Sequence, residues 1–243
     1  MILNKGDMEM RKIKIILLLI FCLILSAACN KKNTQDTFDD KEEAIKKEAE
    51  EKSEEDILNE IIQDYGSKIP TKWGEYVDDV VNKINTNDKI IALTFDACGG
   101  KNGSGYDKEL IEYLINEEIP ATLFVNYRWI EVNKEIFLEL SKNELFEIEN
   151  HGTKHRPLSV SENSIYGIEG TNSVQGVIDE IKLNEEAIYN LTGKKTKYFR
   201  SGTAYYDEIA VQIANTMGYK VIGYSVNGDA GATFTSKQVE TSL

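Results

Sequence analysis

The sequence predicts an α/β fold built on a parallel sheet, within residues 89–243. Three observations support this. Short apolar runs typical of buried strands recur along this region, and helix-like segments of about ten residues or more lie between them. Polar residues then follow the ends of several of the apolar runs. Because parallel strands need long crossover connections, this alternation indicates repeated β-α units.

The expected elements can be placed in chain order. Apolar runs predict strands at 90–95, 121–125, 145–148, 197–199 and 220–225. The segments between them predict helices at 107–116, with Asp107 as its cap, and at 132–142, 173–190 and 207–217. Before this region, a helix is expected to begin within 57–62 and to be broken at Pro70, and Glu75–Ile84 is expected to form another short helix.

Composition and charge limit the classes of partner. The chain has 243 residues, of which 41% are hydrophobic, and this suits one domain with appendages. Its formal net charge is −13. Nucleic acid and anionic membrane surfaces are therefore not expected as electrostatic partners, and a monomer is expected.

The N-terminal segment, 1–29, resembles a bacterial lipoprotein signal. Residues before Met10 look like an upstream extension; after it, basic residues precede the uncharged run Ile15–Leu25. That run is shorter than the roughly 20 residues that a membrane span needs. The resemblance implies cleavage before Cys29, a lipid on its thiol, and an extracytoplasmic protein anchored to the cell membrane. Ordinary secretion with cleavage near Ala28 is the alternative.

The remaining chain divides by composition. Residues 30–62 are rich in Lys, Glu and Asp and predict a charged tether, with an acidic interaction arm as the alternative. Residues 63–88 are expected to be a helical lead-in to the domain at 89–243. Of three cysteines, Cys22 would leave with the signal and Cys29 would carry lipid. Cys98 would then be alone, which excludes a disulfide within one mature chain.

Both histidines of the chain, His151 and His155, lie directly after the strand expected at 145–148. Neutral imidazole is a common metal ligand, and His-x-x-x-His on one helical turn aims two rings at one point. We therefore expect a divalent metal, Zn²⁺ first. The alternative is the start of a surface helix with two incidental histidines.

Other candidate site residues also follow strand ends, and in a β/α barrel those ends share one face. Asp96, Arg200 and Asp229 would then converge on the histidines. Two histidines and a carboxylate on Zn²⁺ leave a position for water, and a second carboxylate can act as general base. Arg200 could hold that base ionised, with Asp229 orienting Arg200. Together these groups predict hydrolysis of an amide or ester.

Several residues have simpler interpretations as well. Asp96 could cap a turn, and Cys98 could be a small buried hydrophobe. Glycines at 99, 100, 103 and 105 indicate a flexible loop and no phosphate site. Four aromatic residues could stack on sugars, although single aromatic residues more often lie in a core. They are Trp129, Tyr166, Tyr205 and Tyr206.

These motifs resemble those of the NodB-like polysaccharide deacetylases, carbohydrate esterase family four. Leu93–Asp96 resembles the first motif, usually Thr-Phe-Asp-Asp, and Asn150–His155 with Leu158-Ser159 resembles the second. Phe199-Arg200 resembles the start of the third motif, and Asp229 the acidic residue of the fourth.

The resemblance covers about residues 89–236 and implies a distorted β/α barrel. It also implies removal of N-acetyl groups from an envelope or extracellular polysaccharide, such as peptidoglycan or a chitin-like glycan, with a divalent metal. By the family pattern Asp96 is the base, and His151 and His155 are metal ligands. Arg200 is the partner of the base, and Asp229 is the tether of Arg200.

The sequence departs from the family pattern at several positions. Ala97 stands where a metal-binding aspartate is usual, so a third ligand is expected from Asp96 first, or from Cys98, Asp107 or water. Gly152 replaces the serine or threonine after the first histidine.

Two further departures concern the third motif and the end of the chain. Ser201-Gly202-Thr203 replaces a proline-containing turn. The chain stops at Leu243 before the leucine-x-histidine motif that supplies the general acid, so the last strand or strands are expected to be missing. The alternative function is that of a carbohydrate-binding surface lipoprotein with weak or no catalysis.

Overall fold

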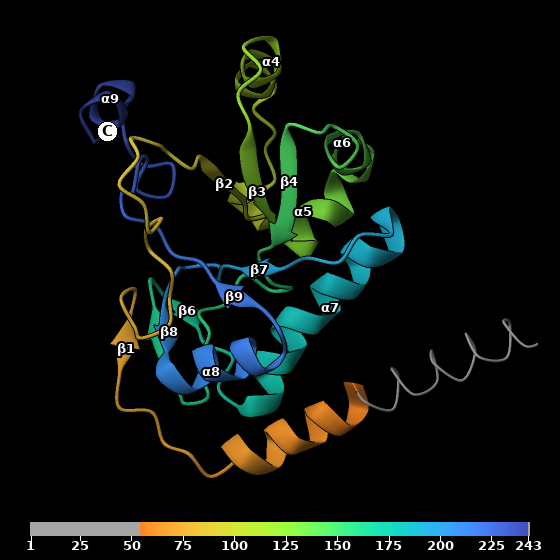
Figure 1. Cartoon of the computed structure of the whole chain (residues 1–243), viewed down its shortest axis with the longest axis vertical. Coiled ribbons are helices and arrows are strands. Elements are labelled where there is room, and N and C mark those ends of the chain that lie inside the picture. The colour runs from red at the N-terminus through yellow and green to blue at the C-terminus, as the bar shows by residue number, and fades with distance from the viewer. Residues whose placement is uncertain (1–53, 243) are drawn as a thin grey trace, which may run out of the picture. The chain divides into compact units, whose positions relative to one another are not determined.

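The computed structural model describes residues 54–242 (Figure 1). The chain divides into the units Met1–Asp56 and Ile57–Leu243, and the second is described below. The expected signal segment, Cys29 and the tether up to residue 53 lie outside the described residues. Among residues 54–242, no helix is long and apolar enough to cross a membrane.

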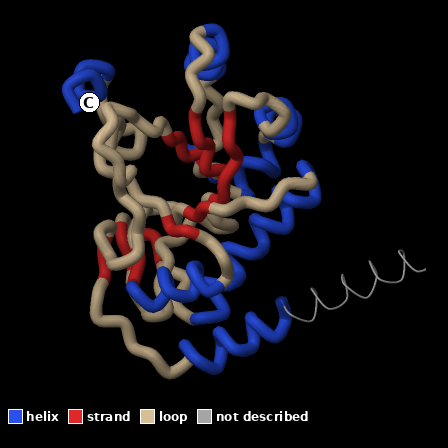
Figure 2. The backbone as a smooth tube through the Cα atoms, in the orientation of Figure 1, coloured by secondary structure: helices blue, strands red, loops and turns tan. Residues whose placement is uncertain are grey.

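A five-stranded sheet forms the centre of the unit, and all of its strand pairs are parallel (Figures 1 and 2). The strand order is β2-β3-β4-β7-β9. The bounds are β2 Thr94–Ala97, β3 Ala121–Val125, β4 Phe146–Asn150, β7 Tyr198–Phe199 and β9 Lys220–Val221. The predicted α/β fold with a parallel sheet is therefore confirmed. Among residues 54–242, β2 pairs only with β3, so these pairings do not show a closed barrel.

Helices connect the strands, as the sequence predicts. Their bounds are α4 Lys108–Asn116, α5 Tyr127–Val132, α6 Lys134–Leu140, α7 Val174–Thr192 and α8 Glu208–Thr216. The Asp107 carboxylate caps α4 by accepting a hydrogen bond from the Leu110 amide, and Gly193 ends α7 in the left-handed conformation. The helix predicted at 132–142 corresponds to α6, whereas α5 and the short helices α3 Gly100–Gly103 and α9 Ser236–Ser242 were not predicted.

Two small antiparallel pairs lie outside the main sheet. β1 (Trp73–Gly74) pairs with β8 (Tyr206–Asp207), and β5 (Ser164–Ile165) pairs with β6 (Ile168–Glu169). None of these strands was predicted, because each is only two residues long and has no alternating pattern.

The helix predicted over Glu75–Ile84 is wrong. Val81 instead extends the main sheet beyond β9: its amide donates to the Val221 carbonyl at 2.9 Å, and its carbonyl accepts from the Gly223 amide at 3.0 Å. Backbone groups used in this way are not available to a helix. The first main strand also begins later than predicted, at Thr94, and the Ile91 side chain is 87% exposed.

A helical segment at 54–65 precedes the domain and packs against it through Ile61. Ile61 is 1% exposed and lies in a core cluster with residues of α7 and α8, whereas the neighbouring Ile62 is 41% exposed. The expected end of the charged tether at residue 62 therefore falls within a helix that contributes to the core.

We expect Ile61→Ala to lower the free energy of unfolding by about 2–5 kcal/mol, because it removes buried methyl groups and leaves a cavity. Ile62→Ala is the matched control and should change that free energy by less than about 0.5 kcal/mol. Urea unfolding of both full-length variants measures the difference. Equal stability of the two would show that this helix does not pack on the domain in solution.

Candidate metal centre and catalytic carboxylate

The ends of three strands of the parallel sheet, β2, β4 and β7, bring the candidate site together. Cys98 follows β2, His151 follows β4 and Arg200 follows β7. Asn150 pairs with Phe199, and the Arg200 amide donates to the Asn150 carbonyl at 3.0 Å. His151 and Arg200 therefore leave the sheet side by side.

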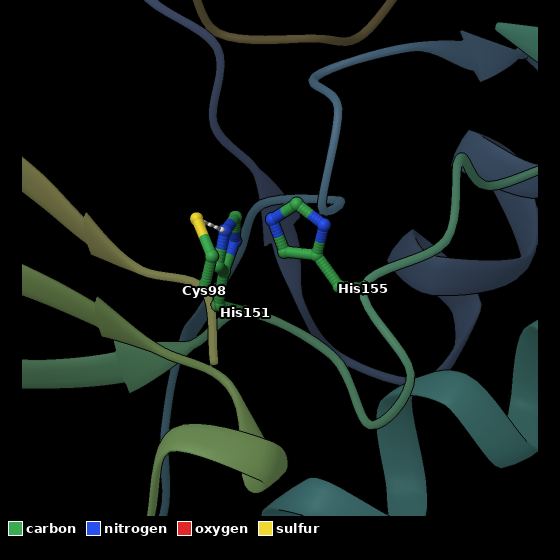
Figure 3. A group of neighbouring side chains, drawn as sticks. All are labelled: Cys98, His151 and His155. Atoms are coloured by element: carbon green, nitrogen blue, oxygen red, sulfur yellow. Dashed lines mark hydrogen bonds between the residues drawn. The ribbon is translucent and has the colours of Figure 1, made fainter. Parts of the chain in front are cut away.

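Cys98, His151 and His155 form a compact group of potential metal ligands (Figure 3). Their ligand atoms all lie within 4.8 Å of one another, and Cys98 Sγ lies 3.7 Å from His151 Nε2. In a tetrahedral zinc site, bond lengths of about 2.3 Å to sulfur and 2.0 Å to nitrogen place the two atoms about 3.5 Å apart. The observed separation therefore suits two ligands of one ion.

The surroundings of His151 fix which of its nitrogens is free. The side chain is 1% exposed, and Nδ1 lies 2.9 Å from the Arg200 carbonyl oxygen. Because a carbonyl can only accept, Nδ1 carries the proton and Nε2 presents a lone pair towards Cys98 (Figure 3). A backbone acceptor on the second nitrogen is the usual arrangement for a metal-binding histidine.

His155 provides the observation that tests the fit of a metal. Its Nε2 is buried and makes no hydrogen bond, although it faces Cys98 and His151 (Figure 3). The two imidazole rings meet edge to face, with centroids 5.0 Å apart. A buried nitrogen without a partner is costly, and a cation between the three side chains would satisfy it. The donor set therefore fits a divalent metal.

Burial also sets the protonation of this group. It lowers the pKa of His151 and, with the neighbouring His151, lowers the pKa of His155 to about 3. Both rings are therefore neutral near pH 7 and keep a lone pair. Burial, followed by the charge of Asp96, raises the pKa of the Cys98 thiol to about 12. A bound cation would favour the thiolate and reverse this shift.

Asp96 lies beside the group and is paired with Arg200. Asp96 Oδ1 accepts a hydrogen bond from Arg200 Nη1 at 2.7 Å, and Oδ2 lies 3.9 Å from His151 Nε2. The Asp96 side chain is 31% exposed, whereas that of Arg200 is 3% exposed. From the sequence, Asp96 was the first candidate for the third metal ligand, and Cys98 was an alternative. The geometry brings Cys98 into the donor group and leaves Asp96 bound by Arg200.

The expected tether between Asp229 and Arg200 is not formed among the described residues. The guanidinium donates instead to Thr94 Oγ1 and to the carbonyls of Ile222 and Gly223, and it lies over the Phe124 ring. Backbone carbonyls after β9 thus take the place that a carboxylate was expected to fill. Asp229 Oδ1 accepts from the Gly231 amide, although its charge contributes to the raised pKa of Cys98.

The two histidines do not share a helical turn, which corrects that prediction. They lie on a loop in which Gly152 has φ of 79° and His155 has φ of 61°. Asn126, at the end of β3, donates to the carbonyls of His151 at 2.9 Å and of Gly152 at 2.7 Å. Sequence reasoning missed Asn126, although its position after a predicted strand is the signal that could have found it.

The loop after Arg200 lies directly against His155. A Cβ atom built on Gly202 would be 2.4 Å from His155 Cγ, closer than any side chain can approach. The contact leaves no room for a side chain at this position and fixes the distance between the two loops.

The four aromatic candidates separate into two kinds. Trp129 and Tyr206 are 4% and 0% exposed and belong to the core. Tyr166, at the tip of the β5–β6 hairpin, is 71% exposed and lies 5.8 Å from Tyr205 between ring centroids. Trp73 lies 5.7 Å from Tyr205 between ring centroids, so Tyr205, on the loop after Arg200, contacts both other rings.

A family model described as "Polysaccharide deacetylase" matches residues 83–222, more than half of the chain. The chain belongs to the polysaccharide deacetylase family. The resemblance to carbohydrate esterase family four is thereby confirmed. No curated protein sequence matches the chain.

Solved structures with the same fold include members of this family. The Bc1960 peptidoglycan N-acetylglucosamine deacetylase is 18% identical, with a TM-score of 0.53, and 70% of each chain is covered. A mutant of BA3943, a CE4 family pseudoenzyme from Bacillus anthracis, is 18% identical, with a TM-score of 0.51 and coverage of 65% of this chain and 54% of that one.

Bacillus subtilis PdaA, a family 4 carbohydrate esterase, is 24% identical, with a TM-score of 0.48; 70% of this chain and 61% of that chain are covered. This chain spans between 52% and 61% of the length of the first three matching structures. The likenesses to the Bc1960 deacetylase and to the BA3943 mutant show the fold.

We expect Cys98→Ser, His151→Ala and His155→Ala each to lose stoichiometric Zn²⁺, whereas Asp96→Asn retains it, because the first three residues supply the donor atoms. Atomic absorption after dialysis measures the zinc content. With Co²⁺ as a probe, the wild type should show a thiolate charge-transfer band that Cys98→Ser lacks. Zinc loss in Asp96→Asn together with zinc retention in Cys98→Ser would instead make Asp96 the third ligand.

Proposed function

We propose that this chain hydrolyses N-acetyl groups on a polysaccharide in a metal-dependent reaction. The observation that supports this most is the position of the Asp96–Arg200 pair beside the donor group of Cys98, His151 and His155. A carboxylate positioned by an arginine next to a metal centre is what hydrolysis of an unreactive amide requires. Membership of the polysaccharide deacetylase family supports the choice of amide and of sugar.

His151, His155 and Cys98 would hold the metal. Imidazole and thiolate donors suit Zn²⁺ better than Mg²⁺ or Ca²⁺, which prefer oxygen. When bound, the metal would polarise the acetamide carbonyl as a Lewis acid. The Arg200 carbonyl keeps the proton on His151 Nδ1, so that Nε2 stays directed at the centre.

Asp96 would act as the general base. Its partly exposed carboxylate accepts a proton from the attacking water while Arg200 holds it in position. The water oxygen forms a bond to the acetyl carbon, the carbon–nitrogen bond breaks, and the amine nitrogen takes the proton that Asp96 accepted from the water. The acetyl group leaves as acetic acid, which ionises to acetate in solution. Arg200 orients the Asp96 carboxylate by a charged hydrogen bond at 2.7 Å.

The ring surface of Trp73, Tyr166 and Tyr205 supports a glycan as the substrate. Aromatic faces pack against the apolar faces of sugar rings, and Tyr205 lies on the same loop as Arg200. This surface equally suits the alternative function, carbohydrate binding with little catalysis. The two functions differ in acetate release and can be separated by one assay.

The test incubates the full chain and Zn²⁺ with N-acetylglucosamine oligomers and with peptidoglycan fragments, and measures released acetate and bound oligomer. We expect Asp96→Asn to lower kcat by about 10²–10⁴-fold while oligomer binding persists, because only the base is lost. Asp88→Asn, an exposed aspartate outside the site, is the control and should leave both unchanged.

Each outcome of that assay separates the two functions. Binding without acetate release by the wild type would favour the carbohydrate-binding alternative. Absence of both binding and release would contradict a role on these glycans altogether.

We also propose that the protein is exported and anchored through a lipid on Cys29. The support is the order of basic, uncharged and small residues before Cys29. Cys29→Ala should move the protein from the membrane fraction to the soluble fraction of the producing cells. Unchanged membrane association of Cys29→Ala would count against the lipid.

A further inference from the structure

Glu180, on α7, is a buried acidic residue that contacts the loop between the two histidines. It is 3% exposed. Its Oε1 and Oε2 accept hydrogen bonds from the Lys154 amide at 2.9 and 3.0 Å, and Oε1 also accepts from the Arg156 amide at 3.1 Å. Since a buried carboxylate is costly without such bonds, its partners indicate what it is there to hold.

The amides bound by Glu180 flank His155 on both sides. His155 itself has φ of 61°, a conformation that costs a non-glycine residue of the order of 1 kcal/mol or more. The loop is therefore kept in an unfavourable shape by contacts from outside it. α7 supplies a second such contact, because Thr153 Oγ1 donates to the Glu180 carbonyl at 2.9 Å.

Glu180 also occupies the space beside Gly152. A Cβ atom built on Gly152 would lie 2.5 Å from Glu180 Oε1. The position next to His151 therefore holds no side chain that could anchor the loop from within. The acidic group from α7 approaches in its place.

We propose that Glu180 is a positioning residue of the metal centre: by binding the amides on both sides of His155, it directs His155 Nε2 towards Cys98 and His151. This inference rests on the proposed metal-dependent function. Glu180 lies on α7, so this helix would help to position a metal ligand although it carries none of the motifs found at the strand ends.

A purely structural role for Glu180 makes a different prediction, and the same helix offers a matched control. Glu185 also accepts a backbone hydrogen bond from a loop, that of the Thr196 amide at 3.0 Å, but this loop carries no ligand. Loss of either carboxylate should lower stability. Only loss of Glu180 should alter metal binding.

The experiment measures Zn²⁺ affinity by chelator competition and the Co²⁺ absorption spectrum in full-length wild type, Glu180→Gln and Glu185→Gln. We expect Glu180→Gln to bind Zn²⁺ about 10–100-fold more weakly and to show an altered Co²⁺ spectrum, because an amide cannot accept from all the amides that the carboxylate accepts. Glu185→Gln should match the wild type in both. Glu180→Asp, which keeps the charge, should recover part of the affinity.

The outcomes separate this inference from the function on which it rests. If the wild type binds neither metal, the proposed metal centre is wrong, and the role of Glu180 falls with it. If the wild type binds metal and Glu180→Gln binds it with the same affinity and spectrum, the positioning role alone is overturned. Equal weakening in Glu180→Gln and Glu185→Gln would assign the effect to general stability.

A double-mutant cycle tests the contact with Gly152. Gly152→Ala should weaken Zn²⁺ binding strongly in the wild type and less in Glu180→Ala, since removal of the carboxylate frees the space for Cβ. Some penalty should persist in both, because φ at Gly152 is 79°. Additive effects would show that the two residues do not compete for this space.

Discussion

The site depends on one backbone register, the pairing of Asn150 with Phe199 between β4 and β7. It places His151 and Arg200 directly after two adjacent strands, where the Arg200 carbonyl accepts a hydrogen bond from His151 Nδ1. The Arg200 side chain lies over the Phe124 ring of β3 and reaches Asp96 near the end of β2. Arg200 thus contacts the His151 imidazole through its backbone and the Asp96 carboxylate through its side chain.

This arrangement explains how neutral and charged groups lie next to each other in a buried site. The cation of Arg200 is matched by the carboxylate of Asp96 and by two carbonyl groups, so its burial does not leave an unpaired charge. The histidines are neutral because burial lowers the pKa of each. The charge pair and the neutral donors therefore have separate roles within a few ångströms.

Local signals made much of the fold predictable from the sequence. The strand at 121–125 has the predicted bounds, and Asp107 caps α4 as expected, because both depend on short-range chemistry. The incorrect helix prediction at Glu75–Ile84 shows what local patterns miss: Val81 pairs with backbone more than a hundred residues away, next to β9. A distant backbone partner leaves no trace in a local pattern.

The site was predictable to the extent that topology determined it. Asp96 lies near the end of β2, His151 and Arg200 directly follow β4 and β7, and parallel strands bring those ends together. Cys98 was identified as an alternative and could have ranked higher, since residues two apart along an extended chain share a face, and Asp96 and Cys98 are two apart. Glu180 was missed because its place in the middle of an amphipathic helix gives no sign of what its side chain meets.

The close approach at Gly202 has a consequence for anyone who would move this centre to another protein. Since the Gly202 backbone lies against the His155 ring, and Gly152 against Glu180, the positions of the candidate ligands depend on backbone packing as much as on their own rotamers. Grafting three ligand side chains onto a new scaffold would therefore not reproduce the site. The smallest transferable block comprises the segments 96–99, 150–156 and 199–203 together with the stretch of α7 that carries Glu180.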